Sequence, residues 1–259
     1  MITRAIAADG QPPFSDQSLV DLRTGSRSLI SVDSAAAILG DGEAELVVDP
    51  DARGRGIGTK LLERIIADTS GDLLVWAHGD HSAARALAAS HGLEPVRTLL
   101  QLVGPVGRAE TRSTRTTTAI RPFDTGADED AWVALNAKTF AFHAEQGSVT
   151  RADLDELKSE DWFDAEDFLV AVDGDEMVGY NWLKVEHGRG EIYVIGVDPT
   201  RQGSGLGRAL MAAGYARLAD HGIHSVHLYV EGDNAPALAL YRSLGFVDFS
   251  VDIQYRLSR

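Results

Sequence analysis

The chain has 259 residues, 44% of them hydrophobic, and a formal net charge of -15 at pH 7. This charge argues against binding to nucleic acid or to an anionic membrane, because both partners require a basic protein surface. Cysteine is absent, which excludes disulfides, thiolate nucleophiles and cysteine zinc sites, and the scattered histidines lack ligand spacing, so we expect no metal.

Length and hydropathy bound the organisation of the chain. A chain of this length suits two α/β domains better than one. No run of about 18 apolar residues occurs, and the first residues contain Arg4, Asp9 and Asp16 without a hydrophobic stretch. We therefore expect a cytoplasmic protein with neither a signal peptide nor a membrane span.

An internal repeat dominates the chain. The first copy reads Leu46-Val47-Val48-Asp49-Pro50, then Arg53-Gly54-Arg55-Gly56-Ile57-Gly58, and the second reads Ile195-Gly196-Val197-Asp198-Pro199, then Gln202-Gly203-Ser204-Gly205-Leu206-Gly207-Arg208. Asp198 stands 149 positions after Asp49. Each copy predicts a strand, a glycine-rich turn and an amphipathic helix.

The repeat continues after each helix. Residues 75–81 resemble residues 228–234 at a spacing of 153, and each block precedes a helix that ends at His91-Gly92 or Leu244-Gly245. Final strands are predicted at 96–103 and 247–257. The first copy is shorter before its turn, so we expect an opening strand and part of a helix to be missing there.

The rest of the second half follows in order. Residues 107–118 are rich in Thr, Arg and Gly and predict a linker between domains at 1–106 and 119–259. A strand at 119–123, a helix at 128–142, and strands at 168–172 and 177–185 joined by a turn precede the second glycine turn. The predicted order of the second domain is β-α-α-β-β-β-α-β-α-β, a mixed α/β sheet flanked by helices.

The glycine turns carry the first functional signal. Without Cβ atoms, their backbone N–H groups can approach a phosphate at the start of a helix, where the helix dipole favours an anion. The letters exclude a Walker loop, because Gly207 is followed by Arg208, and exclude a GxGxxG dinucleotide motif. The turns are therefore candidate pyrophosphate sites.

The turn from Gln202 to Gly207 resembles the Q/R-x-x-G-x-G/A motif of the GNAT acetyltransferases, and Asn234 to Phe246 resembles their N-x-x-A-x-x-L-Y-x-x-x-G-F motif. The resemblance implies two tandem GNAT domains that bind acetyl-CoA. The implied acetyl-CoA contacts are Leu46, Val47, Val48, Arg53, Gly54, Arg55, Gly56, Ile57, Gly58, Ile195, Gly196, Val197, Gln202, Gly203, Ser204, Gly205, Leu206, Gly207, Arg208, Asn234, Ala235, Pro236, Ala237, Leu238 and Ala239.

Acetyl transfer to an amine requires a proton acceptor for the ammonium and a proton donor for the CoA thiolate. The resemblance implies Glu191 as the base, on a strand whose alternation would put Tyr193, Ile195 and Val197 on the same face. It implies that this strand splays from its neighbour, and that Tyr241 is the acid. The assignment requires Glu191 and Tyr241 close to the acyl thioester and on one side of it.

The first copy lacks both groups at the matching spacings. Gly42 stands where Glu191 is expected, Glu45 has the opposite strand parity, and Ala88 stands where Tyr241 is expected. The first domain is therefore predicted to bind acetyl-CoA without catalysing transfer.

Several segments, including Trp76-Ala77-His78-Gly79, Glu145-Gln146-Gly147 and Trp182-Leu183-Lys184-Val185, are similar to the mycothiol synthase family of GNAT enzymes. This resemblance implies acetylation of cysteinyl-glucosaminyl-inositol by a monomer, with substrate contacts at Asp16, Glu145, Lys184, Glu191 and Tyr229. Two alternatives stay open: a GNAT enzyme for another amine, such as an aminoglycoside or a protein N-terminus, and a non-catalytic acetyl-CoA sensor.

Overall fold

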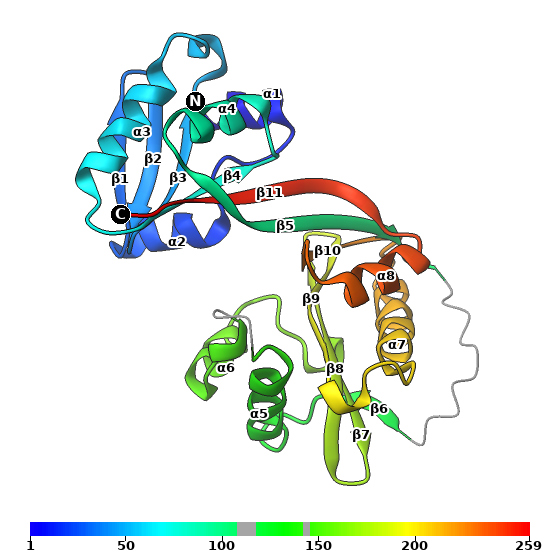
Figure 1. Ribbon diagram of the computed structural model, residues 1–259. Coiled ribbons are helices and arrows are strands. Elements are labelled where there is room, and N and C mark those ends of the chain that lie inside the picture. The colour runs from blue at the N-terminus through cyan, green and yellow to red at the C-terminus, as the bar shows by residue number, and fades with distance from the viewer. Residues whose placement is uncertain (108–117, 142–145) are drawn as a thin grey trace. The chain divides into compact units, whose positions relative to one another are not determined.

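The repeat in the sequence becomes two compact units in the computed structural model (Figure 1). Residues 1–107, 118–141 and 146–259 are described, apart from the side chain of Asp16. Unit 1 consists of Met1–Gln101, Val230–Asn234 and Asp248–Arg259, and unit 2 of Leu102–Tyr229 and Ala235–Val247. The segment Asp248–Arg259 therefore groups with unit 1, whereas the predicted division assigned it to the second domain. Residues 108–117 of the predicted linker lie outside the described residues.

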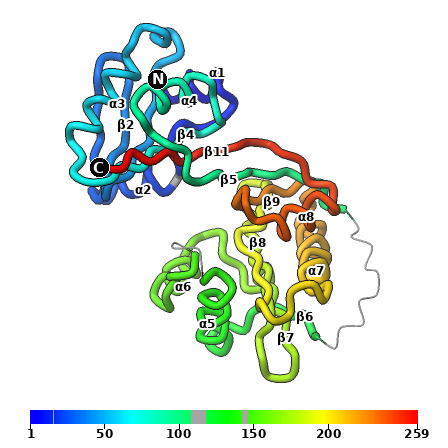
Figure 2. The backbone as a smooth tube through the Cα atoms, viewed as in Figure 1, coloured from blue at the N-terminus to red at the C-terminus, as the bar shows by residue number. Residues whose placement is uncertain are grey.

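Unit 1 is built on a sheet with the strand order β1-β2-β3-β4-β11. These strands are β1 (Ser28–Val32), β2 (Ala35–Gly40), β3 (Glu43–Val48), β4 (Leu73–His78) and β11 (Val247–Leu257). The helices are α1 (Ile2–Asp9), α2 (Asp16–Thr24), α3 (Ile57–Asp68) and α4 (Ser82–Ser90). β11, the red strand in Figure 2, pairs antiparallel with β4 between Asp252–His78 and Leu257–Leu73. β5 (Glu94–Pro105) begins in unit 1 and ends in unit 2.

Alternating side chains of β2 place unit 1's helices on two faces of its sheet. Ala35 and Ala37 pack with α3, whereas Ala36 and Ile38 pack in a cluster with Ala5 of α1. Burying one aliphatic side chain of α3 stabilises the fold by about 1.5–3 kcal/mol. Residues 1–27 contain no strand before β1. Two helices are nevertheless present before β1.

Unit 2 has the strand order β10-β9-β8-β7-β6. Its strands are β6 (Ala119–Pro122), β7 (Phe168–Asp173), β8 (Glu176–Glu186), β9 (Arg189–Val197) and β10 (Ser225–Glu231). Its helices are α5 (Glu129–Thr139), α6 (Arg151–Leu157), α7 (Leu206–Asp220) and α8 (Ala235–Ser243), with short 3-10 turns at Gln146–Ser148 and Ala165–Asp167. The order of elements predicted for the second half is confirmed, although most of its last strand, β11, belongs to unit 1.

Two hydrophobic layers enclose the sheet of unit 2. On the α5 face, Trp132 packs edge-on against Trp182, which stacks on Phe168 at 4.3 Å between ring centroids. On the other face, Leu206 and Leu210 of α7 pack with the strands. Aromatic pairs of this kind add about 0.5–1.5 kcal/mol each beyond their burial, so this layer stabilises the α5 face of the sheet.

A β-bulge in β9 changes which side chains share a face. β8 and β9 pair Leu183 with Ile192 and Trp182 with Val194, which leaves Tyr193 as an extra residue. Glu191 and Val194 therefore both face α5, whereas Ile195 and Val197 pack with α7. The prediction that Glu191 shares a face with Ile195 and Val197 is wrong, because simple alternation does not continue through the bulge.

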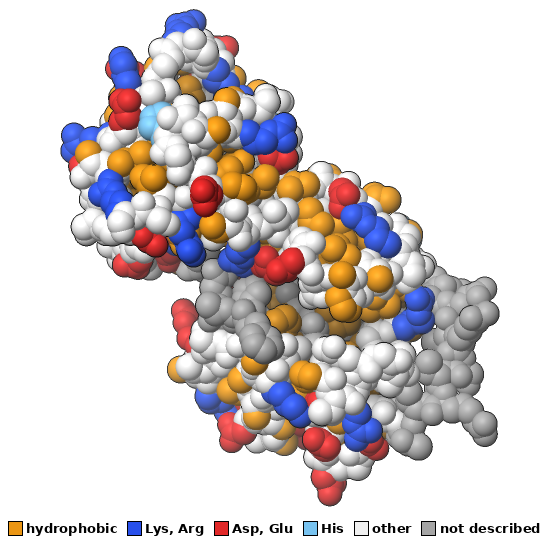
Figure 3. All heavy atoms as spheres, viewed as in Figure 1, with side chains coloured by type: hydrophobic (Ala, Val, Ile, Leu, Met, Phe, Trp, Pro, Cys, Tyr) orange, Lys and Arg blue, Asp and Glu red, His pale blue; other side chains and the backbone are white. Residues whose placement is uncertain are grey.

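The surface carries charges of both signs. Figure 3 shows basic and acidic side chains interspersed on the visible face of each unit, so the net charge of -15 is not gathered into one acidic field there. In the described part of the chain, no helix combines the length and the apolar character needed to cross a membrane.

Candidate active site

Each unit has the glycine turn that the sequence predicts, in the same backbone conformation. Gly203 and Gly205 have φ of 77° and 90°, and their counterparts Gly54 and Gly56 have 73° and 76°. The second glycine of each pair is the N-cap residue of a helix, α7 or α3. A Cβ at Gly54 or Gly203 would meet nothing within 4 Å, so each turn leaves open space at a helix N-terminus for an anion.

A buried aspartate anchors each turn. Asp198 accepts hydrogen bonds from the backbone N–H and hydroxyl of Thr200 at 2.8 and 2.7 Å, and from Lys138 of α5 at 2.6 Å. Burial opposes ionisation of Asp198, but the bonds from Lys138 and Thr200 outweigh it and lower its pKa to about 2. In unit 1 Asp49 pairs with Arg4 of α1. An ion pair thus fixes each turn to a helix, α5 in unit 2 and α1 in unit 1.

The parallel strands beside each turn separate toward their carboxyl ends. β9 and β10 pair only over residues 190–192 and 226–228, although β9 continues to Val197. β3 and β4 pair only over residues 43–45 and 74–76. The splay predicted for the strand of unit 2 is therefore present, and the corresponding strands of unit 1 separate in the same way. An extended ligand arm can lie in such an opening against strand backbone that no longer pairs with its neighbour.

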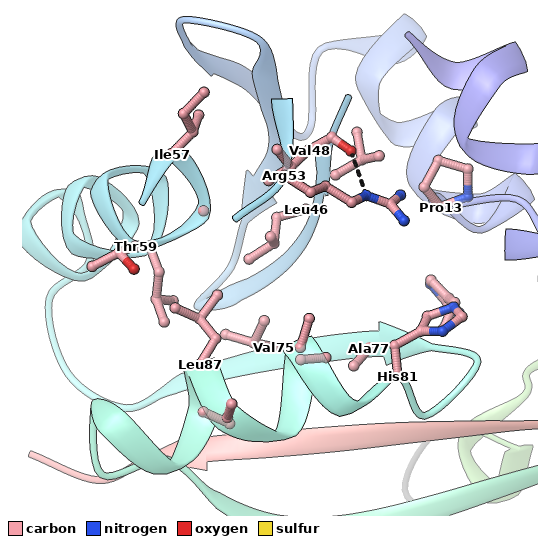
Figure 4. A pocket seen from close by; sticks show the side chains of 18 of the residues that line it. Pro13, Leu46, Val48, Arg53, Ile57, Thr59, Val75, Ala77, His81 and Leu87 are labelled. Carbon is pink, nitrogen blue, oxygen red and sulfur yellow. Dashed lines mark hydrogen bonds between the residues drawn. The ribbon is translucent and has the colours of Figure 1, made fainter. Parts of the chain in front are cut away.

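In unit 1 the opening leads to a cavity of about 450 Å³ (Figure 4). Its walls are mostly apolar and come from β3, α3, β4 and α4: Leu46, Val48, Ile57, Val75 and Leu87. Figure 4 shows Arg53 and His81 at one end of this cavity. A cavity with mostly apolar walls beside a glycine turn has room for an extended, largely apolar ligand arm.

Arg53, the first residue of the unit 1 motif, braces the turn from inside the unit. Its guanidinium donates to both carboxylate oxygens of Asp9 at 2.7 and 2.6 Å, and its Nε donates to the carbonyl of Val48 at 3.2 Å. The hydrogen bond from Arg53 lowers the pKa of Asp9 despite partial burial. The neutral Gln202 takes this position in unit 2, so the ion pair is particular to unit 1.

Three polar side chains form a row across the sheet of unit 2. Lys184 on β8 lies opposite Glu191 on β9, which lies opposite His227 on β10. Neighbouring residues in adjacent strands project to the same face, so the three side chains stand together on the α5 face. Tyr229 follows His227 by two residues and shares this face, where it is 49% exposed.

An aromatic wall bounds this row. The ammonium of Lys184 lies 5.1 Å from the ring centroid of Trp162 and 3.6 Å from the carboxylate of Glu186. The ring of Trp162 in turn contacts Tyr193, the bulge residue, at 5.0 Å between centroids. Polar groups on one side and aromatic faces on the other suit a small polyhydroxylated molecule that carries an amine.

Tyr241 occupies the opposite side of the sheet. It lies on α8, only 5% exposed, with its ring 5.6 Å from that of Phe246. Burial, and then the nearby Tyr215 of α7, raise the pKa of Tyr241, so its phenol stays protonated. Glu191 and Tyr241 thus lie on different faces of the sheet, and their expected placement on one side of the acyl thioester stays a prediction.

The remaining predicted residues have different outcomes. Segment 195–197 ends β9, and segment 235–239 begins α8, directly after Asn234. Asp16 begins α2 in unit 1, but its side chain is not described, and Glu145 lies outside the described residues. His227 and Trp162 were not predicted. Strand alternation back from Tyr229 would have indicated His227, once the pairing of β9 and β10 was known.

The bulge also changes the comparison between the two units. Unit 1 has no extra residue in β3, so the counterpart of Glu191 is Glu43 and not Gly42. The prediction that this carboxylate is absent is therefore wrong. Glu43 is held by Arg27 at 2.6 Å, Trp76 at 2.6 Å and Gln254 at 2.9 Å, and these bonds occupy it as an acceptor. The match of Ala88 to Tyr241 stands, since α4 and α8 align residue by residue.

A second charged network fills the interior of unit 1. Glu45 accepts from the backbone N–H and hydroxyl of Ser15, both at 2.7 Å. The ring of His78 lies between Glu45, at 3.5 Å, and Asp252 of β11, at 3.1 Å. Burial disfavours the imidazolium, but the two carboxylates outweigh it and raise the pKa of His78 to about 9. Among the described residues no group of histidines and carboxylates is arranged to hold a metal ion.

Both units match known acetyltransferase families. Residues 131–246 match the acetyltransferase (GNAT) family, and residues 27–93 match an acetyltransferase (GNAT) domain. A GCN5-related N-acetyltransferase from Sphaerobacter thermophilus has the same fold, with a TM-score of 0.70 at 22% identity over 99% of this chain and 90% of that one. A tandem GNAT protein from the clavulanic acid pathway gives a TM-score of 0.66 at 17% identity, over 98% and 92%.

Relatives of higher identity match nearly the whole chain. A mycothiol acetyltransferase of Clavibacter michiganensis subsp. michiganensis is 49% identical, over 98% of this chain and 88% of that protein. One from Kocuria rhizophila is 44% identical, over 98% and 92%. With the twin glycine turns, the splayed strands and these relatives together, the chain belongs to the mycothiol acetyltransferase family of GNAT acetyltransferases.

Proposed function

We propose that the protein transfers the acetyl group of acetyl-CoA to the cysteinyl amine of cysteinyl-glucosaminyl-inositol, the last step of mycothiol biosynthesis. The observation that carries this proposal is 49% identity, over 98% of the chain, to a protein named mycothiol acetyltransferase. The polar row and aromatic wall of unit 2 support it, because they offer partners for an amine and for hydroxyl groups.

Unit 2 is the proposed catalytic unit. Glu191 accepts a proton from the ammonium, which frees the nitrogen lone pair to form the new bond to the thioester carbon. The backbone N–H groups near Gly196 and Val197 receive the carbonyl oxygen as its negative charge develops. Tyr241 donates its proton to the sulfur when the carbon–sulfur bond breaks, and the second proton that the nitrogen loses on forming the amide restores the phenol. Its buried, protonated phenol suits that role.

Substrate recognition is assigned to five side chains. Lys184 and Tyr229 share the sheet face of Glu191 and can donate to hydroxyl oxygens. Asp16 and Glu145 are assigned as carboxylate acceptors for the remaining hydroxyl or ammonium groups, on the family resemblance alone. Glu191 would serve both in binding and in proton transfer.

Unit 1 is proposed to bind acetyl-CoA without transferring its acetyl group. The open turn at Gly54 and the cavity of about 450 Å³ support binding. The three donors on Glu43, and alanine at position 88, argue against catalysis there. We further infer a monomer that requires neither metal, nucleic acid nor membrane, and the net charge of -15 favours this last point.

The test is acetyl-CoA turnover, followed by thiol release, with three acceptors at equal concentration. These are the cysteinyl pseudodisaccharide, free cysteine and an aminoglycoside. The proposal expects the pseudodisaccharide to give the highest kcat/KM by at least about tenfold, since free cysteine lacks the hydroxyl groups of the sugar and the aminoglycoside lacks the cysteinyl amine. Faster turnover of the aminoglycoside would make the protein a different GNAT enzyme. Tight CoA binding without turnover of any amine would make it a sensor.

A further inference from the structure

His227 extends the proton-handling machinery of unit 2. It is the β10 member of the row that contains Lys184 and Glu191, and the strand register places it directly beside Glu191. Adjacent residues of parallel strands lie about 5 Å apart between Cα atoms, which lets a carboxylate and an imidazole on one face meet or share a water.

The position of the pair relative to the strand opening favours a chemical role. Pairing between β9 and β10 ends one residue beyond Glu191 and His227, at Ile192 and Leu228. The two side chains therefore stand at the closed end of the splay. An acyl group held by the backbone near Gly196 would lie above them in the opening.

The charges around His227 keep it able to accept a proton. Burial, and then the positive charge of Arg189, lower the pKa of His227 below its ordinary value, so the ring is neutral near pH 7. Among the described residues on the same face, the other charged or titratable groups nearby are Lys184, Glu186, Arg189, Glu191, Tyr193 and Tyr229, and Glu160 acts on Tyr193. A neutral imidazole beside a carboxylate is a suitable second acceptor.

From this geometry we infer that His227 is the onward proton acceptor for Glu191 in the proposed acetyl transfer, and the inference rests on that function. The ammonium N–H bond breaks as its proton passes to the carboxylate of Glu191, and the proton then moves to a ring nitrogen of His227. Glu191 returns to its anionic form while the amine forms its bond to the thioester carbon. The imidazolium later releases the proton to water.

Lys184 does not compete for this role. Its ammonium already contacts the carboxylate of Glu186 and the ring of Trp162, and a charged ammonium has no lone pair to accept a proton. A proton on Glu191 can therefore pass only toward β10, to His227, because Lys184 on the β8 side cannot accept it.

The first experiment is the pH dependence of kcat/KM for the wild type and for His227→Gln, with His224→Gln as the matched control. His224 is an exposed histidine just before β10. We expect His227→Gln to lower kcat at pH 7 by roughly tenfold or more and to move the acid limb of the profile to lower pH, because Glu191 alone then sets that limb. His224→Gln should retain the wild-type profile. A His227→Gln profile that superimposes on the wild type overturns the inference and leaves the proposed function standing.

The second experiment needs no substrate. The imidazole of His227 is titrated by NMR in the wild type and in Glu191→Gln, with its signal assigned from its loss in His227→Gln. Removing a neighbouring negative charge should lower the pKa of His227 by about one unit. An unchanged titration shows that the two groups do not interact and overturns the inference. A wild type that acetylates no amine would overturn the proposed function itself, and the inferred step with it.

Discussion

The same substitution in both glycine turns separates catalysis from simple binding. Gly203 and Gly54 have φ of 77° and 73°, and a Cβ at either would contact nothing within 4 Å. Alanine in this left-handed conformation costs about 1–2 kcal/mol, of which about 0.4–1 kcal/mol is offset by reduced freedom of the unfolded chain. Gly203→Ala and Gly54→Ala should therefore lower the free energy of unfolding equally, by roughly 1 kcal/mol.

Activity should distinguish the two variants. In Gly203→Ala the methyl group enters the space proposed for the pyrophosphate, so we expect the KM for acetyl-CoA to rise by about tenfold, which corresponds to about 1.4 kcal/mol of lost binding. Gly54→Ala should leave kcat and KM within twofold of the wild type. Thiol release measures the kinetics, and urea unfolding checks that stability changes equally. If Gly54→Ala impairs turnover as much as Gly203→Ala, unit 1 takes part in catalysis and our division of roles is refuted.

Three further changes test individual side chains. Glu191→Ala should lower kcat strongly with little change in CoA affinity, measured by calorimetry, and unchanged turnover would remove Glu191 as the base. Tyr241→Phe keeps the buried ring but loses the proton donor, so kcat should fall by roughly tenfold or more with an unchanged melting temperature; a normal kcat would exclude Tyr241 as the acid. His78 has a pKa of about 9 in the fold against 6.5 ordinarily, so its pairs with Glu45 and Asp252 stabilise unit 1 fully below pH 6.5. That stability is lost as the pH rises through 9. Urea unfolding of the wild type and His78→Gln at pH 6 and pH 10 should therefore differ more at pH 6, by roughly 3 kcal/mol at most, and an equal difference at both values would contradict this account.

Local patterns predicted most of the fold. The glycine spacing gave both turns because left-handed glycines and a helix start are determined within a few residues, as at Gly203 and Gly205. The order of elements in the second half followed from apolar periodicity and was confirmed. The strand predicted at 247–257 matches β11 in extent, but its pairing with β4 depends on residues distant in the sequence.

The candidate site was harder to predict because a single inserted residue decides it. Alternation is reliable only while two strands remain in register, and the extra Tyr193 shifts β9 against β8. Because of that shift, the residue of unit 1 that corresponds to Glu191 is Glu43, whereas the sequence spacing pointed to Gly42. His227 was missed for a related reason, since its relation to Glu191 exists only across the pairing of β9 with β10.

The pairing of β11 with β4 has a consequence for how the protein is made. Gly79 donates its backbone N–H to Asp252 across a separation of 173 residues, and His78 also lies against that aspartate. On the ribosome, the strand that borders β4 emerges only after all of unit 2. During translation of unit 2, the edge of β4 that later pairs with β11 therefore stays unpaired. Forming a contact between residues so far apart in the sequence is also slow. A ribosome stalled before Asp248 would hold a nascent chain whose first unit is the less protected one, the reverse of the usual order in which the earlier domain matures first.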